Sequence, residues 1–367
     1  MSDATAQPTP VRLPGAALAY LAGILGEEVS GARPIGGGSS NVTLLLDTPT
    51  RTLVLRHGPV GHGLASAHDM AREYRVMSAV QDTAVPVPRM LALCSDASLL
   101  GAEFYVMEYI EGVIPAAAPP VQPLPPRFAE TEAQRRSMGL ALIHSLVDLH
   151  AVDPAVVGLA DFGRPAGYAE RQVKRWSDQW ETWKTRESAA MEELLRRLRR
   201  AIPASDEYTI VHGDYRLGNC IFDCDDPGRI LGILDWEMST LGDPIADLGY
   251  TLVYWGEEAD AEARFEAMDL SKVTAAPGFL TRRELVEEYA RCSGRDVSSV
   301  DFFEMLARLK LAVFGERGYA RILQAQQSGT SSTEPISRSE GWRRCDQHVE
   351  LALATADASE DPRLHSA

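Results

Sequence analysis

The amino-terminal part of the chain alternates short apolar runs with turn residues, a pattern that predicts strands. A short amphipathic helix over 14–29 comes first, and 67–81 again has its apolar residues at helical spacing along one face. Four further runs are rich in β-prone residues. We predict strands in the run ending near Asp47, at 52–57, around 90–94 and around 103–110. This half of the chain is therefore expected to be strand-rich with one helix inserted.

The pattern changes at 115–126, where six prolines predict an extended connector, because proline fixes φ and lacks a backbone donor. Beyond it the pattern is mostly helical, with one β-prone island over 208–234 and a tail after about 355 that is expected to fray. The clearest helices are predicted at 130–151, 167–201, 281–292 and 297–324. A strand-rich lobe joined to a helical lobe favours a ligand in the cleft between them.

The charge balance is acidic, with 36 lysines and arginines against 52 aspartates and glutamates and a net charge of -16. Nucleic-acid-binding proteins usually show the opposite balance, so we expect no nucleic-acid partner. No apolar run approaches the ~20 residues that span a bilayer, and the start lacks the pattern of a secretory signal. Five scattered cysteines without a CxxC pair indicate neither a disulfide framework nor a zinc knuckle. We predict a reduced, soluble, cytoplasmic protein without a membrane partner.

The β-prone island carries acids and an amide directly beside apolar strands. Asp214 and Asn219 bracket a short loop after one strand, and Asp235 ends a later one, 21 residues after Asp214. A carboxylate at the end of a buried strand is costly unless it is paired or bound to metal. Such oxygen ligands can hold Mg²⁺ on nucleotide phosphates, while another aspartate orients and deprotonates an acceptor hydroxyl. The spacing His-x-Asp-x4-Asn, followed by a strand ending in Asp, matches what phosphoryl transfer requires.

The segments GGGSSN, LVLRHGP, AREYRVMSAV, FYVMEYIEG, VHGDYRLGN and ILDWEMSTLGDPIADLGY follow one another over roughly 30–255. They resemble the aminoglycoside phosphotransferase family of the protein-kinase-like fold, and in particular the kinase-like domain fused to some acyl-CoA dehydrogenases. The resemblance implies an α+β fold of two lobes, a small β-rich lobe with one helix and a large, mainly helical lobe. The expected domains are 1–108, the lobe with the nucleotide loop, and 109–367, with the hinge, the proline-rich connector and the helical lobe.

The resemblance also implies roles for residues of the island. Asp214 would be the catalytic base that orients the acceptor hydroxyl, and Asn219 and Asp235 would bind Mg²⁺, with ATP as the phosphoryl donor. The triplet Asp-Trp-Glu that begins at Asp235 stands where many protein kinases have Asp-Phe-Gly. The chain then reaches GDPIADLGY within a few residues, which leaves no room for a long activation loop. A small-molecule kinase is therefore favoured over a protein kinase.

The nucleotide-binding residues implied by the resemblance lie in the amino-terminal half. Arg56 falls where protein kinases keep a lysine, and Glu73 would be its ion-pair partner, with an ordinary surface pair as the alternative. The glycine-rich loop would cover the phosphates, because glycine lets the backbone approach them closely. The other implied contacts are the loop residues Gly37, Gly38, Ser39 and Ser40 and the hinge residues Glu108 and Ile110.

Each of these sites also has a purely structural interpretation. Asp214 and Asp235 could cap turns, and GGGSSN could be a plain turn. His212 is expected to be a buried histidine that supports the loop rather than a base. Asp243 is expected to cap the following helix, and Asp247 to brace the catalytic loop.

Substrate choice should come from the helical lobe. In the pattern over 167–186, Trp176, Trp180 and Trp183 share one face, beside the basic residues Arg171, Lys174 and Arg175. The tryptophans are either core, with the bases solvated, or a platform for an amphipathic substrate with an anionic end. Together with the resemblance this favours a hydroxyacyl-CoA, then another small alcohol, then an aminoglycoside, which the net charge would suit. A non-catalytic, nucleotide-binding pseudokinase module is the alternative of another class, and the oligomeric state stays open.

Overall fold

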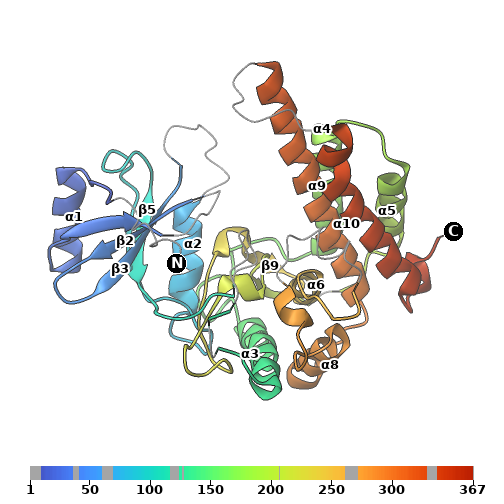
Figure 1. The fold of residues 1–367 in the computed structure, drawn as a ribbon, viewed down its shortest axis with the longest axis horizontal. Coiled ribbons are helices and arrows are strands. Elements are labelled where there is room, and N and C mark those ends of the chain that lie inside the picture. Colours follow the sequence, from blue (N-terminus) through green and yellow to red (C-terminus); the bar gives the residue numbers. More distant parts are fainter. Residues whose placement is uncertain are drawn as a thin grey trace, which may run out of the picture.

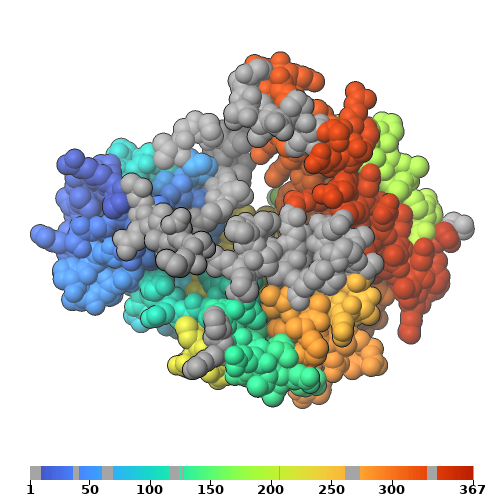
Figure 2. Space-filling model, in the orientation of Figure 1, coloured from blue at the N-terminus to red at the C-terminus, as the bar shows by residue number. Residues whose placement is uncertain are grey.

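The computed structural model describes residues 10–35, 41–59, 69–115, 124–125, 128–205, 207–260, 272–328 and 337–366. Figure 1 shows a sheet-based lobe at one end of the molecule and long helices at the other. In the space-filling view the blue amino-terminal segments and the orange and red carboxy-terminal ones likewise occupy opposite ends (Figure 2). No helix in the described part of the chain is long and apolar enough to cross a membrane.

Five strands form the sheet of the amino-terminal lobe: β1 (Gly31–Pro34), β2 (Val42–Asp47), β3 (Thr52–His57), β4 (Met90–Cys94) and β5 (Phe104–Glu108). Their order across the sheet is β1-β2-β3-β5-β4, and each neighbouring pair is antiparallel. Strands β2 and β3 form a hairpin across the segment TPTR.

The two faces of this sheet bury different partners, because successive side chains of a strand point to opposite sides. Leu44 and Leu46 pack in a cluster with Leu21 of α1 (Gly15–Leu25), whereas Leu45 belongs to the main core with Met77 of α2 (Met70–Val80). The two helices accordingly lie on opposite sides of the sheet, with α2 toward the helical lobe (Figure 1).

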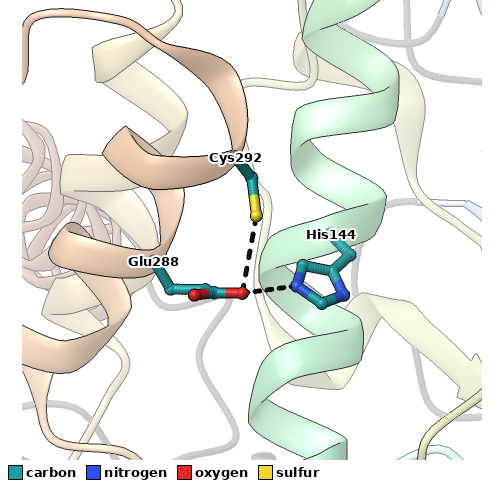
Figure 3. A group of neighbouring side chains, drawn as sticks. All are labelled: His144, Glu288 and Cys292. Atoms are coloured by element: carbon teal, nitrogen blue, oxygen red, sulfur yellow. Dashed lines mark hydrogen bonds and ion pairs between the residues drawn. The ribbon is translucent and has the colours of Figure 1, made fainter.

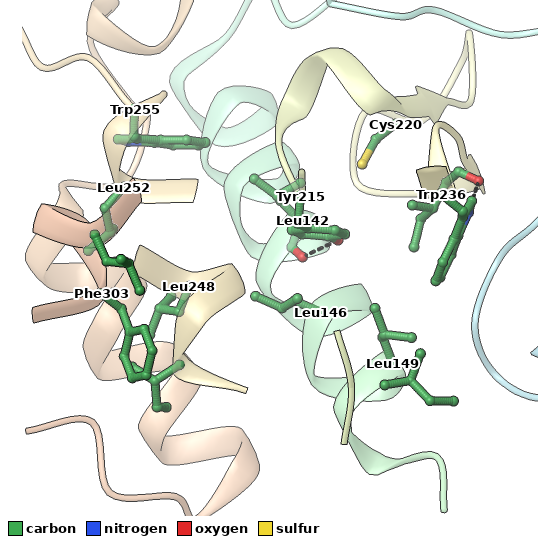
Figure 4. Close-up of a cluster of buried hydrophobic side chains, with 14 of the residues drawn as sticks. Leu142, Leu146, Leu149, Tyr215, Cys220, Trp236, Leu248, Leu252, Trp255 and Phe303 are labelled. Carbon is green, nitrogen blue, oxygen red and sulfur yellow. Dashed lines mark hydrogen bonds between the residues drawn. The ribbon is translucent and has the colours of Figure 1, made fainter. Parts of the chain in front are cut away.

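Seven helices build the described part of the carboxy-terminal lobe: α3 (Glu132–Ala151), α4 (Tyr168–Trp183), α5 (Ala189–Arg200), α6 (Ile245–Val253), α8 (Arg282–Ser293), α9 (Val300–Gln327) and α10 (Arg338–Ala358). Leucines of α3 and α6, with Tyr215, Trp236, Trp255 and Phe303, are buried together at the centre of this lobe (Figure 4). These buried aromatic side chains form a packed layer that supports the polar loops of this lobe.

Two short strand pairs hold the polar loops against this packed layer. β6 (Thr209–Val211) pairs with β9 (Thr240–Gly242), and β7 (Cys220–Phe222) pairs with β8 (Ile230–Ile233), both antiparallel. Short 3₁₀ turns connect them: η1 (Leu217–Asn219) and η2 (Trp236–Met238). The chain therefore passes from β6 through the predicted catalytic loop to η1, and from β8 through Asp235 to η2.

Two of the expected helical boundaries are wrong. The single helix predicted over 167–201 is two helices, because Lys184 has extended ψ and the Ser188 side chain accepts a hydrogen bond from Met191 N to begin α5. The tail beyond 355 is folded: α10 runs to Ala358, and Leu364 in the turn η4 (Pro362–Leu364) is buried. The buried face of α10 is formed partly by alanines. Its apolar pattern in the sequence is therefore too weak to predict that the tail is folded.

Candidate functional site

The loop after β6 brings Asp214 and Asn219 into direct contact. Asn219 Nδ2 donates to Asp214 Oδ2 at 2.9 Å and to the Asp214 carbonyl at 2.8 Å. Arg216 Nε lies 3.4 Å from Asp214 Oδ1. The nitrogen of the Asn219 amide makes both hydrogen bonds, so its oxygen is used in neither. The carboxylate of Asp214 is thus held from two sides by residues of its own loop.

Asp247, on α6, fixes the backbone of this loop from below. Its Oδ2 accepts from His212 N at 2.6 Å and its Oδ1 from Gly213 N at 2.7 Å, while His150 Nε2 lies 3.3 Å from Oδ2. Burial would raise the pKa of Asp247, but the hydrogen bond and the charge of His150 outweigh it, and the pKa is lowered. The predicted bracing role for this aspartate therefore matches the geometry.

The loop conformation depends on Gly213 and His212. Gly213 has φ of +80°, and a Cβ there would lie 2.6 Å from the Met238 carbonyl oxygen, so only glycine fits. His212 is fully buried, its Nε2 lies 2.9 Å from Leu234 O, and Asp214 N donates to its Nδ1 at 3.2 Å. Both ring nitrogens contact backbone groups, which agrees with the expected supporting role.

Asp235 faces the amino-terminal lobe across the cleft. Its backbone is left-handed, with φ of 68° and ψ of 60°, and its Oδ1 accepts from Arg56 Nη2 at 2.7 Å. Leu234 N donates to the Asn219 carbonyl at 2.8 Å, which places Asp235 one residue beyond the point where the two strand ends meet. The structure therefore brings Asp235 close to the Asn219 end of the catalytic loop, as the spacing predicts.

Arg56 and Glu73 form a buried ion pair, not a surface one. Arg56 Nη1 lies 3.5 Å from Glu73 Oε2, and their side chains are 13% and 1% exposed. Tyr105 donates to Glu73 Oε2 at 3.0 Å, and Asn41 Nδ2 donates to Oε1 at 3.4 Å. Burial raises the pKa of Glu73, and Arg56 opposes this effect. Burial would lower the pKa of Arg56, but the surrounding Tyr105, Glu73 and Asp235 outweigh it, and the pKa is raised. Arg56 thus joins β3, α2 and the strand end at Asp235.

Glu237 also belongs to the site, although no role is predicted for it from the sequence. Its Oε2 is buried without a hydrogen-bond partner among the described residues. The pKa of Glu237 is raised to about 7, first because the carboxyl is buried and then because Asp235 and Glu73 are near. The sequence feature that could have indicated a role is its position two residues after Asp235, in the triplet Asp-Trp-Glu.

The predicted hinge lies where β5 leaves the sheet. Glu108 ends β5, and its N–H donates to Arg89 O at 2.9 Å. The Ile110 N–H has no hydrogen-bond partner among the described residues. The predicted nucleotide-loop residues Gly37, Gly38, Ser39 and Ser40 lie outside the described residues.

A cavity of about 360 Å³ opens beside the catalytic loop. Gly213, Glu237 and Lys310 line it near the loop, and Arg171 and Arg175 of α4 line its other side. This volume falls within the range of small-molecule sites, about 300–1,000 Å³. The cavity therefore offers space for a small molecule beside the catalytic loop.

Of the two alternatives for the tryptophans of α4, the core describes two of the three. Trp176 and Trp180 are only 5% and 1% exposed and belong to the main core, although Trp176 also lines the cavity. Lys174 points away from the cavity and pairs with Asp178 at 2.7 Å, with both side chains mostly exposed. The basic residues thus divide: Arg171 and Arg175 line the cavity, and Lys174 does not.

A second group of polar side chains joins α3 to α8 (Figure 3). His144 Nε2 lies 2.6 Å from Glu288 Oε1, and Arg291 Nη2 donates to the same oxygen at 2.7 Å, with Cys292 Sγ at 3.4 Å. The hydrogen bonds from Arg291 and His144 lower the pKa of Glu288 to about 2. A carboxylate already held by a guanidinium is a poor metal ligand, so this group is an ion-pair contact between two helices.

Comparisons with known proteins show the family and the fold of the chain. A family model described as "Phosphotransferase enzyme family" matches residues 31–283. Acyl-CoA dehydrogenase family member 11 of Gallus gallus is 36% identical over 309 residues, which cover 82% of this chain and 38% of that protein. The chain spans about a third of the length of the curated relatives that it matches.

Solved structures show the same fold. A putative aminoglycoside phosphotransferase from Ralstonia eutropha is 29% identical with a TM-score of 0.74, and the match covers 95% of this chain and 100% of that one. The ternary complex of aminoglycoside phosphotransferase APH(4)-Ia with AMP-PNP and hygromycin B has a TM-score of 0.57 at 15% identity, covering 92% and 98% of the two chains. The predicted protein-kinase-like, two-lobe α+β fold is thereby confirmed. The chain belongs to the phosphotransferase enzyme family.

Proposed function

We propose that this chain transfers the γ-phosphoryl group of ATP to the hydroxyl of a small molecule, with a hydroxyacyl-CoA as the first choice of acceptor. The observation that carries the proposal is that Asn219 holds Asp214, that a hydrogen bond from Leu234 N to the Asn219 carbonyl joins their loop to the strand end at Asp235, and that Arg56 reaches Asp235 from the other lobe. Phosphoryl transfer depends on positioning and electrostatic stabilisation, and these side chains are of the types it uses.

Asn219 and Asp235 are the proposed Mg²⁺ ligands. Mg²⁺ takes oxygen ligands, and each of the two residues retains a side-chain oxygen outside the hydrogen bonds described above. The chemistry that Mg²⁺ supplies when bound is neutralisation of the charge on the β- and γ-phosphates. The donor set of one amide and one carboxylate oxygen therefore fits this ion.

Asp214 is the proposed base. Asn219 and Arg216 hold its carboxylate, so its orientation toward an acceptor hydroxyl is fixed before the substrate arrives. In the transfer step the acceptor oxygen forms a bond to the γ-phosphorus, the bond from that phosphorus to the ADP oxygen breaks, and the hydroxyl proton passes to Asp214. The products are ADP and a phosphate ester.

The nucleotide would lie against the hinge and β3. The Ile110 N–H and the Glu108 carbonyl are the backbone groups proposed to meet adenine, because the Glu108 N–H is already bonded to Arg89. Arg56, held by Glu73, is proposed to contact the phosphates. The loop that is predicted to cover these phosphates consists of Gly37, Gly38, Ser39 and Ser40, and it stays a prediction.

Two observations favour an acyl-CoA over an aminoglycoside as acceptor. Acyl-CoA dehydrogenase family members are among the relatives of this chain. Moreover, arginines and a lysine line the cavity, although the chain as a whole is acidic. A polycationic acceptor would meet like charges there, and the local charge decides binding.

The test is Mg²⁺-dependent ATP turnover with a panel of acceptors, with products identified by mass spectrometry. The panel contains 3- and 4-hydroxyacyl-CoAs, free hydroxy acids, simple alcohols and kanamycin-type aminoglycosides. We expect a phosphorylated hydroxyacyl-CoA as the main product. A phosphorylated aminoglycoside would overturn the choice of acceptor, and ATP binding without transfer to any panel member would favour the non-catalytic module.

Replacing Asp235 with alanine should weaken the binding of Mg·ATP at least about tenfold, a change of ~1.4 kcal/mol, because a carboxylate ligand is lost. Calorimetric titration of ATP with Mg²⁺ and with EDTA separates the metal contribution from the rest. The substitution should weaken the affinity for ATP strongly in the presence of Mg²⁺ and only slightly in the presence of EDTA. Asp235→Asn, which keeps an acceptor for Arg56, controls for loss of the contact between the lobes, and unchanged Mg·ATP affinity in both variants would contradict the assignment.

A further inference from the structure

The cavity beside the catalytic loop is lined by an excess of positive charge. Gly213, which directly precedes the proposed base in the chain, lines this cavity. Five basic residues line it against three acids: Arg72, Arg164, Arg171, Arg175 and Lys310 against Asp69, Glu237 and Asp247. The whole chain has a net charge of -16, so the charge of the cavity lining is opposite in sign to that of the chain.

Neutral groups satisfy two of the arginines in this cavity. Arg72 Nη2 donates to the Phe162 carbonyl and its Nε and Nη2 to the Ser239 carbonyl, and its guanidinium lies 3.8 Å from the centre of the Phe162 ring. Arg171 donates to two carbonyls of the preceding loop. Hydrogen bonds to carbonyls fix a guanidinium in place without neutralising it, so both groups keep their full charge toward the cavity.

Lys310 and Arg175 repeat this arrangement. Lys310 Nζ donates to the Gly213 carbonyl at 2.8 Å and lies 4.5 Å from the centre of the Tyr250 ring, buried at the inner end of the cavity. Arg175, at the exposed rim, lies 5.3 Å from the centre of the Trp176 ring. Among the described residues, no carboxylate oxygen lies within 4.0 Å of the charged groups of Arg72, Arg171, Arg175 or Lys310.

Elsewhere in the helical lobe, poorly exposed cations are paired with carboxylates. Arg308 lies 2.7 Å from Glu304 and is fully buried, and Arg282 lies 2.7 Å from Asp260. Burying a cation is costly unless an anion accompanies it. A group of cations with only neutral partners is therefore the arrangement that a bound anion would complete.

The acids of the cavity do not supply that anion. Asp247 is occupied by two backbone donors and His150, and Asp69 accepts from Arg72 N as the cap of α2. Even with all three carboxylates charged, the five cations exceed the three acids that line the cavity. The residual charge of the cavity is positive.

We propose that this cavity holds the acceptor by an anionic group, a phosphate or a carboxylate, and that Arg171, Arg175 and Lys310 select acceptors that carry one. The inference deepens the proposed function and rests on it for the word acceptor, but the binding of the anion does not require turnover. Lys310 of α9 lies next to the catalytic loop and the two arginines lie on α4, so two helices of the carboxy-terminal lobe supply the three cations.

The experiment measures binding of butyryl-CoA, which has no hydroxyl to phosphorylate, by calorimetry to the full chain saturated with Mg·ADP. Saturation prevents the adenine of CoA from occupying the nucleotide site. Arg175→Gln should weaken binding about tenfold, since one charged contact is lost. Lys174→Gln removes the same charge from the same helix outside the cavity and should change the affinity less than about twofold.

Two further probes identify the anion. The N-acetylcysteamine thioester of butyrate has the acyl group without phosphates, and butyrate has the carboxylate alone. The proposal is supported if the neutral thioester binds weakly and if Arg175→Gln leaves its affinity unchanged. If the substitution weakens the binding of butyryl-CoA, the recognised anion is a phosphate. If it weakens the binding of butyrate, the recognised anion is a carboxylate. Equal behaviour of Arg175→Gln and Lys174→Gln with both anionic probes would overturn it. If the binding results are as expected but no phosphoryl transfer is found, the proposed kinase activity is contradicted and the proposed anion site is not.

Discussion

Asp214→Asn should reduce phosphoryl-transfer turnover about 10²- to 10⁴-fold, the usual contribution of a positioned base, and leave ATP affinity within about twofold. Asparagine keeps the shape of the side chain and can still accept the hydrogen bond from Asn219 Nδ2, so the loop should keep its conformation. It cannot take the proton of the acceptor hydroxyl. Steady-state kinetics with the acceptor found in the panel, and calorimetric titration of Mg·ATP, measure the two effects separately.

Asp225→Asn is the matched control for this experiment. Asp225 is exposed in the turn after β7, its side chain has no hydrogen bond or ion pair among the described residues, and the change removes the same charge. Its turnover should equal that of the unchanged protein. A loss of less than about tenfold in Asp214→Asn would contradict the assignment of Asp214 as the base.

Asp247→Ala should lower the free energy of unfolding by about 3–5 kcal/mol, because it removes a buried charged partner. His212 N, Gly213 N and the His150 ring would lose their acceptor where water cannot replace it. Urea denaturation at pH 7 gives the loss directly. Since the pKa of Asp247 is lowered in the fold, its contribution is present above its unfolded pKa, ~3.9, and disappears as the pH falls through the lower folded value.

Asp243→Ala provides the comparison, because Asp243 is also buried and lies on the same segment. Its Oδ1 accepts one backbone hydrogen bond, from Ile245 N at 2.9 Å, so its loss should cost about 1 kcal/mol. Equal destabilisation by the two substitutions would mean that Asp247 is no more than another capping residue. A larger loss in Asp247→Ala, accompanied by reduced turnover, would agree with a brace for the catalytic loop.

The polar residues at strand ends could be predicted because their chemistry is local. Asp214 and Asn219 are five residues apart, and their contact follows from one short turn. Asp235 follows the next strand pair, so the register of β7 and β8 brings it near. The β2–β3 hairpin and the family were likewise within reach of the sequence, since they rest on one short turn and on local motifs. Strand β1 and the pairing of β3 with β5 were not predicted, because β3 and β5 are separated by α2 and β4 along the chain.

The acceptor cavity could not be predicted, because its parts come from distant segments. Lys310 and Gly213 are 97 positions apart and meet only because α9 packs against the core beneath the loop. The helical pattern over 167–186 gave the correct face for the tryptophans but could not tell which of three bases would turn toward a cavity. The buried face of α10, made partly of alanines, carried too little apolar contrast to reveal a folded tail.

Asp235 is one of two described non-glycine residues with positive φ, a conformation that costs roughly 1–3 kcal/mol for an ordinary side chain. Glycine adopts the same backbone without that cost. A programme of stabilisation that ranked substitutions by melting temperature alone would therefore favour glycine at this position, and would discard the carboxylate that faces Arg56. The most stable version of this chain and its most active version should differ at residue 235, so selection for activity has to oppose selection for stability there.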